Sequence, residues 1–143
     1  MFDAASAQQG QTQEFTAKSG PVIAEMLAPL EHPWKIAVLP GDRLLVTEKP
    51  GRLRLFENGK LSDPIEGVPK VDFEGQGGLL GLVIDPGFSI NNTIYLSYAE
   101  PAEQQPENAT DPGDPRVGDD GPNSDVVLKG LAVARAELDG TKL

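Results

Sequence analysis

The chain of 143 residues contains no cysteine and a single histidine, His32. Without cysteine, neither a disulfide framework nor a thiolate metal site can form, and the redox compartment stays undetermined. One histidine excludes, within these residues, any mechanism that needs two of them. No apolar run approaches the roughly 20 residues of a membrane-spanning helix, so we expect no membrane insertion.

Basic residues are also scarce, with 12 Lys and Arg against 22 Asp and Glu and a net charge of -10. Such an acidic chain repels polyanions, so we expect no nucleic-acid partner and no binding to anionic membranes. Glycine and proline are plentiful, at 16 and 13 residues. This composition is typical of many short strands joined by tight turns.

Two polar stretches stand apart from the rest of the chain. Residues 1–20 lack hydrophobic periodicity, and we expect a disordered leader or the remnant of a signal peptide. Ala5-Ser6-Ala7 has the pattern of a signal-peptidase site but no basic or apolar region before it, so a chance cluster is the favoured interpretation of this triplet. Residues 101–125 are rich in Pro, Asp, Glu and Gly, which predicts a mobile acidic insert. Their carboxylates lack the spacing of a calcium-binding loop.

Between these stretches, apolar runs alternate with turn signals. We expect strands over residues 34–39, 43–48 and 52–56, with turns at Pro40-Gly41-Asp42, Lys49-Pro50-Gly51 and Asn58-Gly59. Residues 22–30 are expected to form an edge strand that leads into them. In the third strand, two leucines alternate with Arg52 and Arg54, which predicts one buried and one exposed face.

The same pattern recurs further along the chain. Residues 82–86 resemble residues 37–40, and residues 94–98 resemble residues 44–48, at offsets of about 46 to 50 residues that are typical of propeller blades. A third match, at residues 132–140, follows the insert. We therefore predict an all-β fold over residues 21–143, consisting of about two blades of a β-propeller that needs further blades to close. A self-contained β-sandwich is the alternative.

A glycine-rich stretch, EGQGGLLGLVIDP over residues 74–86, lies where the second unit begins. Residues 79–84 have the length and boundaries of a buried strand. Gly75 and Gly77 allow unusual backbone conformations and leave room for a ligand or a second backbone. Gln76 is therefore predicted to present its amide on a loop with few side chains, and a tight turn with a solvated glutamine is the alternative.

Four segments in order resemble the soluble aldose sugar dehydrogenases that depend on pyrroloquinoline quinone (PQQ), the glucose/sorbosone dehydrogenase family. They are LEHPWKIAVLP (30–40), LVTEKPGRL (45–53), GQGGLLG (75–81) and IYLSYAE (94–100). The resemblance implies a six-bladed propeller with PQQ on its top face and calcium ions that activate the cofactor and support dimers. It also implies oxidation of the aldose C1 hydroxyl to a lactone, a quinone or dye as electron acceptor, and a periplasmic or secreted location.

Carried over to this chain, the resemblance makes Gln76, with Gly75 and Gly77, the cofactor-binding residues. It places no catalytic residue and no metal ligand here, because the family's histidine base and calcium ligands are expected beyond Leu143. His32 matches the start of the first blade and is expected to be a packing or turn residue. Where the family has a His-Pro turn this chain has Asp85-Pro86, which we expect to turn equally well.

The principal hypothesis is therefore a PQQ- and calcium-dependent aldose dehydrogenase of which this chain carries the N-terminal part. Two alternatives stay open. One is a non-catalytic propeller fragment that acts as a binding or assembly module, and the other is a calcium-dependent propeller lactonase. Apolar blade faces and unpaired strand edges are expected to make the isolated chain associate, as a homodimer or with the missing blades.

Overall fold

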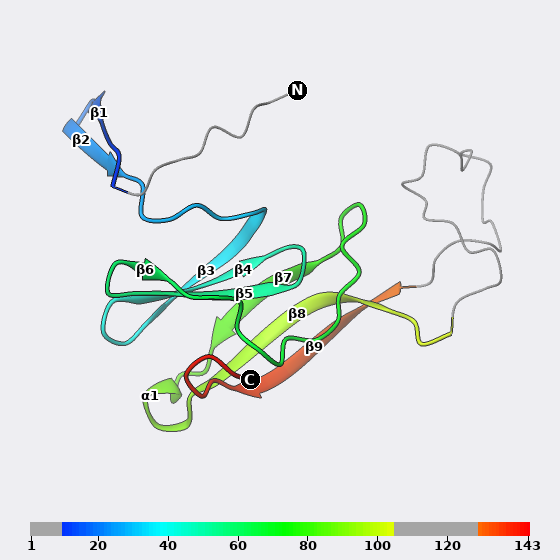
Figure 1. Ribbon diagram of the computed structural model, residues 1–143. Coiled ribbons are helices and arrows are strands. Elements are labelled where there is room, and N and C mark those ends of the chain that lie inside the picture. The colour runs from blue at the N-terminus through cyan, green and yellow to red at the C-terminus, as the bar shows by residue number, and fades with distance from the viewer. Residues whose placement is uncertain (1–9, 105–128) are drawn as a thin grey trace, which may run out of the picture.

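The computed structural model describes residues 10–104 and 129–143 and shows short antiparallel strands with one turn of helix (Figure 1). The elements are β1 (Thr12–Ala17), β2 (Gly20–Glu25), β3 (Pro33–Leu39), β4 (Arg43–Glu48), β5 (Arg52–Glu57), β6 (Lys60–Leu61), β7 (Leu79–Ile84), α1 (Phe88–Asn91), β8 (Thr93–Pro101) and β9 (Lys129–Glu137). Within the described ranges, no helix is long and apolar enough to cross a membrane.

The strands form three sheets, with the orders β1-β2, β3-β4-β5-β6 and β7-β8-β9. Each strand pairs with its neighbour in the sequence, which is the meander of a propeller blade rather than the Greek key of a sandwich. The predicted repeat is present, because β3, β4 and β5 correspond to β7, β8 and β9. The fold is therefore all-β and consists of propeller blades, as predicted.

The predicted hairpin at Asn58-Gly59 joins β5 to β6. Both residues have positive φ angles, 52° and 73°, which is the backbone of a type I′ turn. Phe56 pairs with Leu61 and Glu57 with Lys60 on either side of the turn. Local turn chemistry therefore sets the register at this edge of the first blade.

The two larger sheets pack against each other through one face each, and β7 lies against β3 and β4. Leu53 and Leu55 point into this core while Arg52 and Arg54 remain partly exposed, which confirms the predicted two-faced strand. The buried apolar cluster contains Leu39, Leu45, Leu53, Leu55, Ile65, Leu79, Leu82, Phe88, Ile94, Leu96, Tyr98 and Leu138. Both blades contribute to it, so neither can bury its apolar face without the other.

Strand β7 is only partly the buried strand that the sequence predicts. Leu79 and Leu82 lie in the core, but Val83 is 61% exposed. In this structure β7 pairs with β8 alone, and the face that carries Leu79 and Leu82 is the one that meets the first blade. The apolar run from Leu79 to Ile84 predicts that both faces of the strand are buried. In the structure only one face is buried.

The N-terminal prediction needs correction. Residues 1–9 lie outside the described residues, but the chain from Thr12 onward forms the hairpin β1–β2 instead of a disordered leader. A two-residue turn and a positive φ at Gly20 close it. The predicted edge strand at 22–30 is thus the second arm of this hairpin and ends at Glu25. The hairpin stands apart from both blades and buries none of its side chains (Figure 1).

The acidic insert predicted at 101–125 lies mostly outside the described residues. The described part shows that β8 extends to Pro101, so the connection to β9 begins there. Residues 105–125 of the predicted insert fall in the range that the structure does not describe.

Asp85 organises the turn that follows β7, as expected for Asp85-Pro86. Its Oδ1 accepts hydrogen bonds from the backbone N–H of Gly87 (2.8 Å) and from Asn91 Nδ2 (3.1 Å). Its Oδ2 accepts one from the Tyr95 hydroxyl at 3.1 Å. The bonds from Asn91, Gly87 and Tyr95, with the charge of Arg135, lower the pKa of Asp85 below its ordinary value. The carboxylate thus holds α1 against β8.

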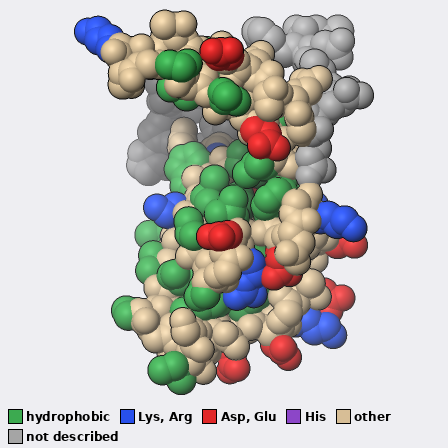
Figure 2. Space-filling view, turned by 90° about the vertical axis from the view of Figure 1, so that its left-hand side faces the viewer, with side chains coloured by type: hydrophobic (Ala, Val, Ile, Leu, Met, Phe, Trp, Pro, Cys, Tyr) green, Lys and Arg blue, Asp and Glu red, His purple; other side chains and the backbone are tan. Residues whose placement is uncertain are grey.

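The outer faces of the blades expose apolar side chains. Ile36 and Val38 on β3, and Leu131 and Val133 on β9, are all more than half exposed. The space-filling view shows hydrophobic side chains gathered over a broad area below the hairpin (Figure 2). Exposed apolar side chains on such outer faces favour packing against another protein surface.

Leu82→Ala tests the shared core, with Val83→Ala as its neighbour on the same strand. Leu82 is 2% exposed and contacts the first blade, so we expect a loss of about 2 to 5 kcal/mol in the free energy of unfolding. Val83→Ala should change it by less than about 0.5 kcal/mol. Urea unfolding followed by circular dichroism measures both, and equal midpoints would contradict the packing described.

Candidate functional site

The loop that carries Gln76 lies at one end of the two packed sheets. At this end β3 and β7 begin, β4 turns into β5, β8 finishes and β9 starts, as Figure 1 shows. Two backbone hydrogen bonds attach the loop here, from Leu79 N to Lys49 O (2.9 Å) and from Ala99 N to Gly78 O (3.0 Å). The antiparallel topology therefore brings segments of both blades around this loop.

The loop from Asp72 to Gly78 has a defined backbone. The N–H of Asp72 donates to Ala99 O at 2.8 Å, and the N–H of Gly77 donates to Glu74 O at 2.9 Å. The Asp72 carboxylate accepts the N–H of Glu74 at 3.1 Å. These bonds form a tight turn with Gln76 at its exposed side.

The glycines of the loop have different functions. A Cβ on Gly78, whose φ is +117°, would lie 2.4 Å from Lys49 O, and one on Gly77 would lie 2.3 Å from Asp72 O. These two glycines are needed for close approach of backbones. Gly75 has a φ of +57° but no atom within 4 Å of the position of a Cβ, so open space lies beside it.

Of the three residues predicted to bind cofactor, Gln76 and Gly75 are exposed, and Gly77 is buried beneath them. The Gln76 amide has two donors and one acceptor oxygen. No hydrogen bond links this amide to another residue in the part of the chain that the structure describes. Gln76 can therefore offer its amide to a ligand, whereas Gly77 acts only through the shape of the turn.

Two lysines that sequence reasoning missed contact the same loop. Lys49 Nζ lies 3.3 Å from Gly75 O, and Lys129 Nζ lies 3.0 Å from Asp72 Oδ1 and 3.4 Å from Glu74 O. An alignment of the two repeats could have indicated these lysines, because each lies beside the connection between the second and third strands of its own blade. Their ammonium groups place positive charge beside Gln76 in an otherwise acidic chain.

Aromatic rings complete the cluster. Lys49 Nζ lies 5.4 Å from the centre of the Trp34 ring and 5.7 Å from that of Phe73, within the range of cation–π attraction. The His32 ring packs against Phe73 at 5.5 Å, its φ is 48°, and its carbonyl accepts the N–H of Lys49 at 3.0 Å. His32 is thus a packing and turn residue, as expected.

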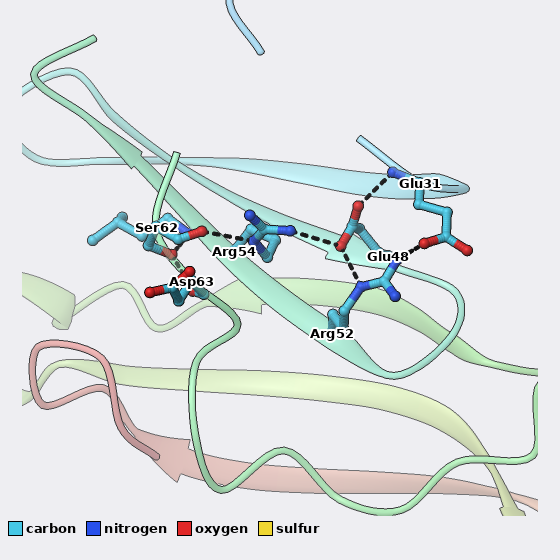
Figure 3. A network of polar contacts seen from close by, with 7 residues as sticks. Glu31, Glu48, Arg52, Arg54, Ser62 and Asp63 are labelled. Carbon is cyan, nitrogen blue, oxygen red and sulfur yellow. Dashed lines mark hydrogen bonds and ion pairs between the residues drawn. The ribbon is translucent and has the colours of Figure 1, made fainter. Parts of the chain in front are cut away.

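A second polar cluster surrounds Glu48, which is 1% exposed (Figure 3). Its carboxylate accepts hydrogen bonds from the N–H of Glu31, from Arg52 Nε at 2.7 Å and from Arg54 Nη1 at 3.5 Å. Arg52 also bonds Glu31 Oε2 at 2.7 Å. An open groove of about 420 Å³ lies here, lined by Pro29, Leu30, Glu31, Glu48, Arg52 and Arg54. With its oxygens engaged, Glu48 holds residues 29–31 across the sheet and is not a free base.

The charge state of Glu48 follows from these contacts. Burial raises its pKa, but the hydrogen bonds from Arg52 and from the Glu31 backbone, with the charges of Arg52 and Arg54, lower it more. The pKa of Glu48 therefore lies below its ordinary value of 4.5, and the pKa of Arg52 is raised in turn by Glu48. The group is an ion pair at neutral pH.

Metal ligands are not gathered in the described ranges. Across residues 10–104 and 129–143, no three His, Asp or Glu side chains come close enough to hold an ion. The described residues therefore offer a hydrogen-bonding amide at Gln76, with two lysines beside it, and no cluster of three carboxylate or histidine side chains.

Gly78→Ala tests the close approach of the loop to the first blade, with Gly75→Ala as its control. A Cβ at residue 78 would clash with Lys49 O, so we expect a loss of stability of about 1 to 3 kcal/mol or more. A Cβ at residue 75 would meet no atom, so Gly75→Ala should lower the free energy of unfolding only by the strain of the positive φ, about 1 kcal/mol. Urea midpoints compare the two, and a tolerated Gly78→Ala would contradict the backbone contact.

Glu48→Gln tests the buried ion pair through its pH dependence. Because folding lowers the pKa of Glu48, its stabilisation is fully present above its ordinary value of 4.5 and is lost as the pH falls through the lower folded value. At pH 7 we expect Glu48→Gln to destabilise the chain by about 1 to 3 kcal/mol. Unfolding midpoints from pH 7 to 3 should converge for the two proteins; a constant difference would show that the charge is unimportant.

The chain is similar in sequence to known proteins. The glucose/sorbosone dehydrogenase family matches residues 30–131. The aldose sugar dehydrogenase YliI of Escherichia coli K12 is 48% identical over 73 residues, which are 50% of this chain and 20% of that protein.

Two solved structures resemble the fold. A glucose dehydrogenase superposes with a TM-score of 0.60 at 41% identity, covering 80% of this chain and 30% of that one. The apo form of the soluble aldose sugar dehydrogenase of Escherichia coli superposes with a TM-score of 0.59 at 38% identity, covering 80% and 28%. The chain thus spans less than a third of the length of each of these relatives. Since the family matches well over half of its residues, the chain belongs to the glucose/sorbosone dehydrogenase family.

Proposed function

We propose that this chain supplies the Gln76 side of the cofactor and sugar site in a PQQ- and calcium-dependent aldose sugar dehydrogenase, as the N-terminal part of such an enzyme. The observation that carries the proposal is the exposed amide of Gln76 at the end shared by both blades. Membership of the sugar dehydrogenase family supports the same reaction class. The substrate would be an aldose, oxidised at C1 to a lactone.

The residues around Gln76 fit one edge of PQQ. A planar o-quinone with carboxylate and carbonyl groups needs hydrogen-bond donors. The Gln76 amide supplies donors, the ammonium of Lys49 holds the neighbouring Gly75 O at 3.3 Å, and open space lies beside Gly75. PQQ, when bound, supplies the acceptor for the hydride that leaves the sugar C1.

The remaining parts of the proposal rest on the family resemblance. The histidine base that takes the proton of the C1 hydroxyl, and the calcium ligands, would lie beyond Leu143. A quinone or dye would accept the electrons, and the location would be periplasmic or secreted. In this chain the contribution is binding and orientation: Gln76 donates hydrogen bonds, and Gly75 and Gly77 give the turn its shape.

A second candidate function is a non-catalytic assembly module. The exposed apolar residues Ile36 and Val38 on one blade, and Leu131 and Val133 on the other, favour it for the isolated chain. Sedimentation distinguishes this behaviour: concentration-dependent association supports it, and a monomer at all concentrations contradicts it.

Dye reduction by the purified chain, with PQQ, calcium and a series of aldoses in excess, tests whether this chain can catalyse the reaction by itself. We expect PQQ binding without turnover, because the chain's one histidine packs against Phe73. Turnover by the chain alone would mean that it contains a base not identified above.

A chimera tests the role of Gln76 itself. Residues 30–131 of this chain, which the family matches, replace the corresponding segment of the Escherichia coli aldose sugar dehydrogenase. We expect sugar oxidation to persist and Gln76→Ala to lower kcat/KM on the order of tenfold or more, the effect of losing a donor at the reacting groups. Lys35→Ala, at an exposed position of β3, is the control. Equal activity of the two variants would overturn the assignment.

A further inference from the structure

We propose that Lys49 is a positioning residue for Gln76, holding the peptide unit that precedes it so that the glutamine amide faces the ligand. The inference rests on the proposed function for the identity of the ligand, PQQ. The effect of Lys49 on the Gln76 loop does not depend on that identity. Lys49 lies 26 residues before Gly75 in the chain and belongs to the other blade. It is therefore a link between the two blades at the site.

The main chain of Lys49 is fixed at both of its polar groups. Its N–H donates to His32 O at 3.0 Å, and its carbonyl accepts the N–H of Leu79 at 2.9 Å. The second bond ties it to the first residue of β7, directly after the loop. The Cα of Lys49 thus has a set position relative to the strand that the Gln76 loop precedes.

The ammonium of Lys49 is held as well. It donates to Gly75 O at 3.3 Å and lies 5.4 and 5.7 Å from the ring centres of Trp34 and Phe73. Within the described residues it forms no ion pair with a carboxylate. The side chain is therefore directed toward the loop by one carbonyl and two aromatic faces.

The carbonyl that Lys49 contacts belongs to the peptide bond between Gly75 and Gln76. Since this unit is planar, holding its oxygen also sets the direction of the Gln76 N and Cα. Gly75 alone would not fix it, because glycine has wide conformational freedom and no atom lies within 4 Å of the position that a Cβ would take. Lys49 thus removes the freedom that Gly75 leaves in the turn.

The experiment uses the full chain with Lys49→Met, which keeps the length of the side chain but loses the ammonium. Lys49→Arg keeps a cation and donors, and Lys35→Met removes an exposed charge elsewhere on the first blade. We expect Lys49→Met to speed hydrogen exchange at the Gly77 amide about threefold to tenfold and to increase backbone NMR mobility at Gln76. Lys49→Arg should restore both, and Lys35→Met should change neither.

Trp34 provides a spectroscopic readout, because it is the one tryptophan of the chain. Its fluorescence should change in Lys49→Met and not in Lys35→Met, since the ammonium lies over its ring. Quenching of this fluorescence by added PQQ should give a dissociation constant about threefold to tenfold higher in Lys49→Met. In a Gln76→Ala background, Lys49→Met should have no further effect on it.

The outcomes separate the inference from the proposed function. An equal loss of PQQ affinity with and without Gln76 would mean that Lys49 binds PQQ directly, which overturns the positioning role. If PQQ does not bind the chain at all, the proposed function fails for the chain, and the exchange of Gly77 still decides the role of Lys49. Unchanged exchange and mobility in Lys49→Met would overturn the inference in either case.

Discussion

Two hydrogen bonds between the blades determine the arrangement of the site. The N–H of Leu79 donates to Lys49 O at 2.9 Å, and Thr47 Oγ1 donates to Leu80 O at 2.9 Å. Thr47 is fully buried and also accepts the N–H of Lys35 at 3.1 Å, so its hydroxyl is satisfied on both sides. Because an unpaired buried hydroxyl is costly, β7 can dock in this register and in few others. The Gln76 loop, which ends where β7 begins, takes its place from this docking.

Strand β4 uses its two faces for two different attachments. Thr47 faces the second blade, and the next residue, Glu48, faces the segment at 29–31 that leads in from the hairpin. Alternation along a strand makes this possible, since neighbouring side chains point to opposite faces. The polar contacts of β4 therefore fix the segments that pack on its two faces, while Leu45 belongs to the apolar core.

The exposed side of the Gln76 loop follows from the same geometry. Gly77 and Gly78 are buried against other backbones, and the turn presents the side chain of Gln76 outward, next to that of Glu74. Lysines from both blades then lie against the loop carbonyls. A hydrogen-bonding amide with a lysine from each blade beside it is the consequence of packing two similar blades side by side, with several connections gathered at one end.

Local features of the sequence were sufficient for the elements. Leu53 and Leu55 alternate with two arginines, and Asn58-Gly59 closes a hairpin, because both signals depend only on neighbouring residues. The hairpin β1–β2 was mistaken for a leader, since its polar composition hides pairing between Phe15 and Val22 that is not stabilised by a core. For Gln76, the glycines around it indicated an exposed side chain on a tight turn, and its role toward a ligand stays a prediction.

The sequence by itself determined the strands of the two blades, their turns, the repeat and the position of Gln76 on a glycine-rich loop, because each depends on backbone preference and on the period of apolar residues. Only the tertiary structure decided that Lys49 contacts Gly75 and that Lys129 contacts Asp72, pairs separated by 26 and 57 residues. It also decided that Glu48 is buried and paired. The physical reason is that these contacts depend on how two sheets pack, which no local pattern encodes.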